Sequence, residues 1–208
     1  MLKTFASSLK ALNKLQILSI VLVVAGLVLV AHFGLSSFRS FQQMRYIHEQ
    51  GLDLGAAEVD AIRPWMTVRF VAVAYAVPQE YIFAELDIPF DQRNSNDTLG
   101  NLNKKYNFGP PAAAGGELPF LDKIRQIITQ YRANPVATGL EEDIRPWMTI
   151  RYIANSTGVP EEYIFQQVGL PATDNENKPL GLLEKEYHYG KQAIGEAIKK
   201  ALAQYGGK

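Results

Sequence analysis

The hexapeptide Ile-Arg-Pro-Trp-Met-Thr occurs twice in this chain, at residues 62–67 and again at residues 144–149. Around it, residues 62–89 and 144–171 are identical at just over half of their positions. After one deletion the match resumes between residues 99–109 and 180–190, and a further helical stretch follows each copy. A repeat of this length indicates two copies of one folding unit, the first from about Asp60 to Arg132 and the second from about Glu141 to Gly206.

The spacing of apolar residues predicts helices throughout each copy, because no stretch shows the sustained alternation of a β-strand. Thr67 and Thr149 are expected to cap the first helix, and Pro78 and Pro160 to open the second. A polar loop, a third helix and a closing helix complete the unit. The predicted fold class is all-α, with an N-terminal transmembrane helix followed by two tandem small helical-bundle repeats.

The predicted transmembrane helix lies in the uncharged segment between Lys14 and Arg39, which is centred on an apolar block from Ile17 to Leu35. At 1.5 Å per residue, about 20 apolar residues match the roughly 30 Å hydrocarbon core of a bilayer. No clear small-residue cleavage motif follows the block, which favours an anchor over a cleaved signal peptide.

Charges flanking the segment predict its orientation. Lys3, Lys10 and Lys14 precede the apolar block, which favours a cytoplasmic N-terminus and a body outside the cytoplasm. Beyond the block, Ser36 or Ser37 is expected to start a separate juxtamembrane helix. The expected organisation is an N-terminus at 1–14, an anchor at 15–35, a juxtamembrane helix and linker at 36–59, a first repeat at 60–132, a linker at 133–140 and a second repeat at 141–208.

The repeated Arg-Pro-Trp element allows two interpretations. Each tryptophan can pack on the first turn of the helix that follows it, as part of the core, or it can belong to a contact surface used once per copy. Arg69 and Arg151 fall in a first helical turn, where a positive charge is unfavourable, so we expect each to have a carboxylate or carbonyl partner, such as Glu80 or Glu162. The candidate partner-binding residues are Arg63, Trp65, Arg69, Tyr81, Arg145, Trp147, Arg151 and Tyr163.

Several classes of chemistry find no support in the sequence. The chain has no cysteine, and none of its three histidines has a second ligand at metal-binding spacing. It contains no P-loop, no nucleophile elbow and no dinucleotide fingerprint, so we expect no enzymatic activity, no cofactor and no metal. Beyond the apolar block, 18 basic residues face 21 acidic ones, which argues against general nucleic-acid binding.

Three resemblances accompany these patterns. Residues 148–170 resemble a helix-turn-helix, and the same pattern lies at 66–88, although the start of the second helix carries Glu161 and Glu162 where a DNA reader carries donors. Residues 180–202 resemble the last part of a sterile alpha motif, which implies a protein-binding helical bundle. The tandem pattern as a whole resembles bacterial single-pass membrane proteins with IRPWMT-type helical repeats, a resemblance that implies topology and no activity.

Two function classes follow. The first is a membrane-anchored interaction or scaffold protein that displays two related helical modules to a protein partner or to a second copy of itself, for example as an accessory subunit of a membrane complex. The alternative is a membrane-tethered regulatory nucleic-acid binder of the helix-turn-helix type. The second class requires a cytoplasmic body and a basic surface, neither of which the sequence predicts.

Overall fold

A computed structural model describes residues 14–53, 55, 57–111, 116–140 and 143–206, and all regular elements in these residues are helices. The all-α prediction is therefore confirmed for this part of the chain. Lys3 and Lys10, used above for orientation, lie outside the described residues, as do Glu141 and Glu142. The chain divides into two compact units, Met1–Ile47 and His48–Lys208, which are described separately.

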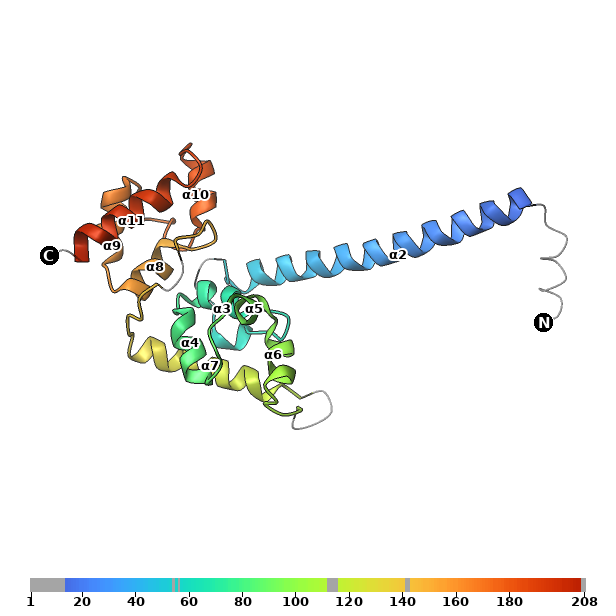
Figure 1. Cartoon of the computed structure of the whole chain (residues 1–208), viewed down its shortest axis with the longest axis horizontal. Coiled ribbons are helices and arrows are strands. Elements are labelled where there is room, and N and C mark those ends of the chain that lie inside the picture. The colour runs from blue at the N-terminus through green and yellow to red at the C-terminus, as the bar shows by residue number, and fades with distance from the viewer. Residues whose placement is uncertain (1–13, 54, 56, 112–115, 141–142, 207–208) are drawn as a thin grey trace. The chain divides into compact units, whose positions relative to one another are not determined.

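The first unit is built on one long helix, α2 (Lys14–Glu49), drawn in blue in Figure 1. The prediction of a new helix at Ser36 or Ser37 is wrong, because α2 runs through both serines without a break. A serine within a helix costs only a fraction of a kcal/mol, and no proline stands nearby to interrupt the hydrogen bonding. The helix ends as expected just before Gly51, which has a φ of 65° and donates its N–H to the His48 carbonyl at 3.1 Å.

The second unit contains all the remaining elements (Figure 1). They are the short 3₁₀ helix η1 (Val59–Ala61) and the α-helices α3 (Val68–Tyr75), α4 (Gln79–Leu86), α5 (Gln92–Asn96), α6 (Leu99–Lys105), α7 (Pro119–Ala133), α8 (Ile150–Thr157), α9 (Glu161–Val168), α10 (Leu180–Glu186) and α11 (Ala193–Gly206). Helix α5 was not predicted from the sequence; it lies in the polar loop and is capped by the Asp91 carboxylate, 2.7 Å from the backbone nitrogen of Asn94.

Local signals explain where the other helices start and stop. The hydroxyls of Thr67 and Thr149 each accept a hydrogen bond, at 3.1 Å, from the backbone N–H three residues later, which confirms the predicted caps of α3 and α8. Both helices end at a residue in the left-handed region, Ala76 in the first copy and Gly158 in the second. The second helices, α4 and α9, begin one residue after the proline rather than at it.

The closing helices α7 and α11 supply one wall of the core. In α7, Phe120, Ile124 and Ile128 recur at helical spacing and are fully buried. The N–H of Phe120 donates to the side-chain oxygen of Asn103 at 3.3 Å, and the N–H of Ile194 in α11 donates to the side-chain oxygen of Glu184 at the same distance. These matching bonds set the register between the closing helices, so that residue 120 corresponds to residue 194.

The Arg-Pro-Trp-Met turn is hydrogen-bonded to the start of α6 in the first copy and of α10 in the second; we call this contact the clamp. In the first copy, the N–H groups of Leu99 and Gly100 donate to the carbonyls of Met66 and Pro64, at 2.8 and 2.9 Å. The Met66 side chain is only 1% exposed and enters the core. The second copy makes the same two bonds, at 2.8 and 2.9 Å, from Leu180 to Met148 and from Gly181 to Pro146.

The clamp leaves little room for a side chain in the first turn of α6 and α10. A Cβ at Gly100 would lie 3.3 Å from the Pro64 carbonyl oxygen, and one at Gly181 would lie 3.2 Å from Cβ of Pro146. Both neighbours belong to a rigid proline that the clamp itself holds, so they have little freedom to move. The glycines therefore allow the close approach of turn and helix.

We predict that Gly100→Ala lowers the free energy of unfolding by about 1 kcal/mol, although alanine favours helix by a similar amount elsewhere. The matched control is Gly195→Ala in α11, where a Cβ would lie 3.5 Å from the Ile144 Cγ2 atom, an ordinary contact. That variant should be neutral or more stable. Thermal unfolding of both proteins tests this, and a stabilised Gly100→Ala protein would contradict the proposed role of the clamp.

Candidate partner-binding site

The tryptophans of the repeated element are partly exposed. Each ring packs on the first turn of the following helix, with ring centroids 6.1 Å apart for Trp65 and Phe70 and 5.7 Å apart for Trp147 and Tyr152. The neighbouring methionines, Met66 and Met148, are fully buried. Each ring is therefore held on its helix and still reaches the surface.

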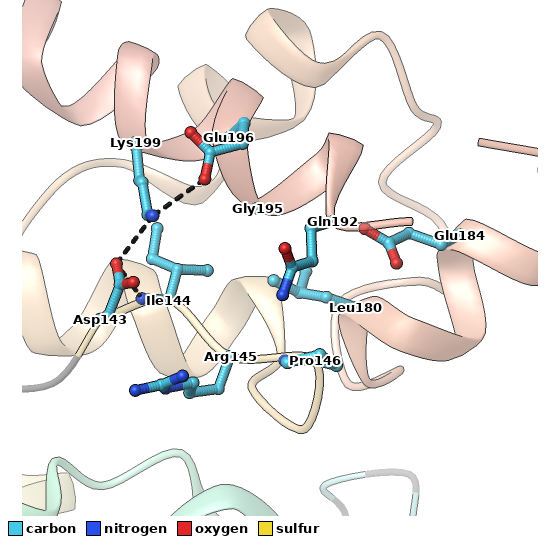
Figure 2. A pocket seen from close by; sticks show the side chains of 10 residues that line it. All are labelled: Asp143, Ile144, Arg145, Pro146, Leu180, Glu184, Gln192, Gly195, Glu196 and Lys199. Atoms are coloured by element: carbon cyan, nitrogen blue, oxygen red, sulfur yellow. Dashed lines mark hydrogen bonds and ion pairs between the residues drawn. The ribbon is translucent and has the colours of Figure 1, made fainter. Parts of the chain in front are cut away.

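The arginines that precede the prolines differ between the copies. In the first copy, Nη1 of Arg63 donates to the carbonyls of Asp60 and Ile62, at 2.6 and 3.0 Å, which holds it against the preceding chain. In the second copy, Arg145 is exposed and borders a cavity of about 110 Å³ next to α11 (Figure 2). Arg145 is thus the more accessible of the two.

Arg151, in the first turn of α8, has an internal carboxylate partner, as expected. Nε of Arg151 lies 3.2 Å from Glu161 Oε2, and its Nη1 donates to the side-chain oxygen of Asn177 at 3.2 Å. The carboxylate partner is therefore Glu161, one residue before the expected Glu162. Arg69 packs across the copies, with its guanidinium carbon 4.9 Å from the centre of the Trp147 ring. This cation–π contact joins two of the predicted site residues.

The two tyrosines of the candidate set pack on the closing helices. Tyr81 lies against Tyr131 of α7, with ring centroids 5.1 Å apart, and Tyr163 lies against Tyr205 of α11 at 5.0 Å. The tryptophans instead pack on the first helices. Each copy therefore distributes its candidate residues over two sets of contacts, one around the Arg-Pro-Trp element and one around the closing helix.

The contact between the two copies also uses residues outside the candidate set. The side-chain amide of Asn155 donates to the Ala76 carbonyl at 2.6 Å, and the N–H of Gln79 lies 3.5 Å from the Tyr152 hydroxyl oxygen. At the positions of Tyr152 and Asn155 the first copy has Phe70 and Val73, which lack these polar groups. The sequence signal for this junction is a pair of equivalent positions that are polar in the second copy and apolar in the first.

Burial makes the Tyr152 phenol unusual. Its side chain is 1% exposed. Burial, with a smaller contribution from the nearby Glu80 carboxylate, raises its pKa to about 12. Both effects disfavour the phenolate, so the neutral phenol belongs to the assembled junction.

Two buried asparagines were also missed. The Asn94 amide donates to the Pro89 carbonyl at 2.7 Å and to the Tyr106 hydroxyl at 2.9 Å. Asn175 makes the same pair of bonds in the second copy, at 2.9 Å to Pro171 and 2.8 Å to Tyr187. These amides organise the polar loop before the third helix, and their recurrence in both loops is the signal that could have found them.

No protein-family model, no curated protein and no solved structure matches this chain. The assignment of the site therefore depends on the contacts described above.

We predict that Asn155→Asp lowers the free energy of unfolding by about 1–2 kcal/mol, because it keeps the shape of the side chain and replaces the donor to Ala76 with an acceptor. The matched control is Asn107→Asp, an exposed position with a φ of 54°. Thermal unfolding of the two variants tests the junction. Equal stability of both would show that the Asn155 bond contributes nothing.

We also predict an alkaline loss of stability that depends on Tyr152. Its folded-state pKa of about 12 lies above the ordinary value of 10, so its contribution is complete below pH 10 and is lost as the pH rises through 12. The Tyr152→Phe variant should lose the last tyrosine to ionise in an ultraviolet titration, whereas Tyr205→Phe, at an exposed tyrosine, should not. A titration curve unchanged by Tyr152→Phe would contradict the assignment.

Proposed function

We propose that this protein is a membrane-anchored interaction protein that presents two related helical modules to a protein partner. The observation that carries the proposal is the apolar helix Leu18–Glu49, which is long and apolar enough to cross a bilayer. Leu22 and Val30 on this helix expose 64% and 71% of their surface. The exposed apolar side chains between Leu18 and Leu35 are unfavourable in water, and insertion into a bilayer removes that cost.

The repeated Arg-Pro-Trp element supplies the proposed contact surface. The clamp and the core use the backbone of the turn and the side chain of its methionine, whereas Trp65 and Trp147 remain partly exposed. Tryptophan and arginine are the residues that most often dominate binding energy in protein interfaces. Their reuse in both copies supports a surface for protein binding, to which Tyr81 and Tyr163 add aromatic area.

The chemistry of the second helices favours a protein partner over nucleic acid. The first turn of α4 carries Glu80, and the first turn of α9 carries Glu161 and Glu162. Carboxylates at these positions repel the phosphate backbone that the helix-turn-helix alternative has to contact. The proposed orientation, with the N-terminus in the cytoplasm and the body outside, is a second reason to prefer a protein partner.

The test is site-specific photocrosslinking of the full chain in native membranes. A benzophenone amino acid at Trp147, and separately at Trp65, should crosslink the same protein, because both tryptophans belong to the proposed contact surface. Each substitution replaces one partly exposed aromatic ring with another. The same group at Tyr189, which is 37% exposed and lies three residues after the end of α10, is the control.

Charge reversal sharpens this test. Arg145→Glu changes an exposed residue of the element and should reduce the crosslink from Trp147 by about tenfold, since a contact between charged groups contributes on the order of 1–3 kcal/mol. Arg93→Glu, at an exposed arginine of α5, should leave it unchanged. The proposal would be contradicted if the crosslinks from the tryptophans were no stronger than those from Tyr189 in a protein whose thermal unfolding is unaltered.

A further inference from the structure

Helix α2 changes character where its apolar block ends. Between Leu18 and Leu35, large apolar side chains are exposed on every side of the helix. Beyond Leu35, Phe38, Phe41 and Met44 recur every third residue and are 59%, 63% and 71% exposed. Residues three apart on a helix are neighbours on one face, so the apolar surface beyond the block covers only one side of α2.

The rest of the helix surface beyond the block is polar. Gln42 and Gln43 lie outside the arc that the three apolar side chains cover, with Gln43 about half a turn round the helix from Phe41. Arg45 follows one turn after Phe41 and ends the apolar face. A helix surrounded by lipid is apolar all round, whereas a helix with one apolar side packs against a neighbour on that side. The face of Phe38, Phe41 and Met44 is therefore suited to one neighbouring element.

The height of this face limits what can cover it. At 1.5 Å per residue, Phe38, Phe41 and Met44 lie about 4.5, 9 and 13.5 Å beyond Leu35 along the helix axis. The headgroup layer on each side of a bilayer is only about 5–7 Å thick, and a tilt of about 20° shortens these heights by less than about a tenth. Lipid can therefore cover Phe38, whereas only a protein neighbour can cover Met44.

A second copy of the chain supplies such a neighbour. Its own anchor holds the same helix in the same direction and at the same height, so the apolar face of one copy lies level with that of the other. Gly34 belongs to this face, one turn before Phe38, and a Cβ built on it has no atom within 4 Å. Glycine at a contact lets two helices approach closely within a membrane.

We infer that α2 forms a parallel pair with α2 of a second copy of this chain, through Gly34, Phe38, Phe41 and Met44. The inference rests on the proposed function, because the bilayer gives the two helices their common height and direction. It adds that the modules are displayed by a dimer, which presents each Arg-Pro-Trp element twice.

The test is disulfide crosslinking of the purified full chain in liposomes at a high ratio of lipid to protein. The chain has no cysteine, so one substitution introduces one reactive thiol. On mild oxidation, Phe41→Cys should form at least about fivefold more covalent dimer than Gln43→Cys, because a disulfide needs Cβ atoms about 3.5–4.5 Å apart. Met44→Cys should also exceed Gln43→Cys, and it keeps both phenylalanines of the face.

Other occupants of the face give different results. Coverage by lipid, or by the rest of the same chain, predicts no covalent dimer from either Phe41→Cys or Met44→Cys. Random collision in the membrane predicts equal dimer from these variants and from Gln43→Cys. Either result overturns the pairing.

A larger side chain at Gly34 tests the assigned face. In the Phe41→Cys protein, Gly34→Leu should reduce the covalent dimer by about fivefold or more, because it holds the helices apart. The space around Gly34 is open, so flotation with the liposomes should not change. Gly26→Leu is the matched control, at a glycine that is also open but lies about 80° round the helix from Gly34, and it should leave the dimer intact. An undiminished dimer in the Gly34→Leu protein would overturn the assigned face.

The two proposals fail separately. If α2 gives no dimer while the tryptophans still crosslink a partner, the pairing is discarded and the interaction function is kept. If α2 pairs while the tryptophans crosslink no partner, the pairing stands and the interaction function is discarded. A chain that does not float with the liposomes would remove the bilayer on which both proposals depend.

Discussion

Two backbone hydrogen bonds join the Arg-Pro-Trp-Met turn of each copy to the start of a later helix, α6 in the first copy and α10 in the second. A helix leaves its first N–H groups without partners, and the turn supplies the carbonyls of the proline and the methionine. The rigid proline ring fixes the turn, the methionine fills the core, and the threonine caps the next helix. Glycine in the third helix permits the close approach. Scaffold requirements thus account for Pro, Met, Thr and the distant Gly of the repeated pattern. Arg145 takes no part in the clamp, and the two tryptophans pack on the first helices while still reaching the surface.

Local signals were sufficient to predict most helices, and non-local contacts explain what they missed. The caps at Thr67 and Thr149 depend on atoms three residues apart, so the sequence specifies them directly. The continuity of α2 through its serines depended on the balance of small propensities, which a possible cap at Ser36 or Ser37 did not outweigh. The site was harder to predict. The contact of Arg69 with Trp147 spans the two copies and could not be inferred from spacing within either one.

The junction shows that the two copies are not interchangeable. Tyr152 and Asn155 carry polar groups that meet backbone atoms of the first copy, whereas Phe70 and Val73 at the same positions carry none. The second copy is thereby specialised to receive the first. One consequence concerns the tryptophans, because Trp147 already holds the Arg69 guanidinium and Trp65 belongs to the other copy. A partner that contacts both would meet two different chemical environments, one with a cation over the ring and one built on Phe70.

The same logic of matched positions bears on the closing helices. Three glycines lie within helices of the two copies near the repeated turn, and they separate by what a side chain would meet. At Gly100 and Gly181 an added Cβ would press on a clamped proline, so glycine fits there better than any larger residue. At Gly195 an added Cβ would make an ordinary contact with Ile144, and the first copy carries a buried leucine there. Glycine at that position loses helix propensity and the burial of a leucine side chain, on the order of 2 kcal/mol, with no backbone requirement in return. Stability alone therefore favours leucine over glycine at residue 195.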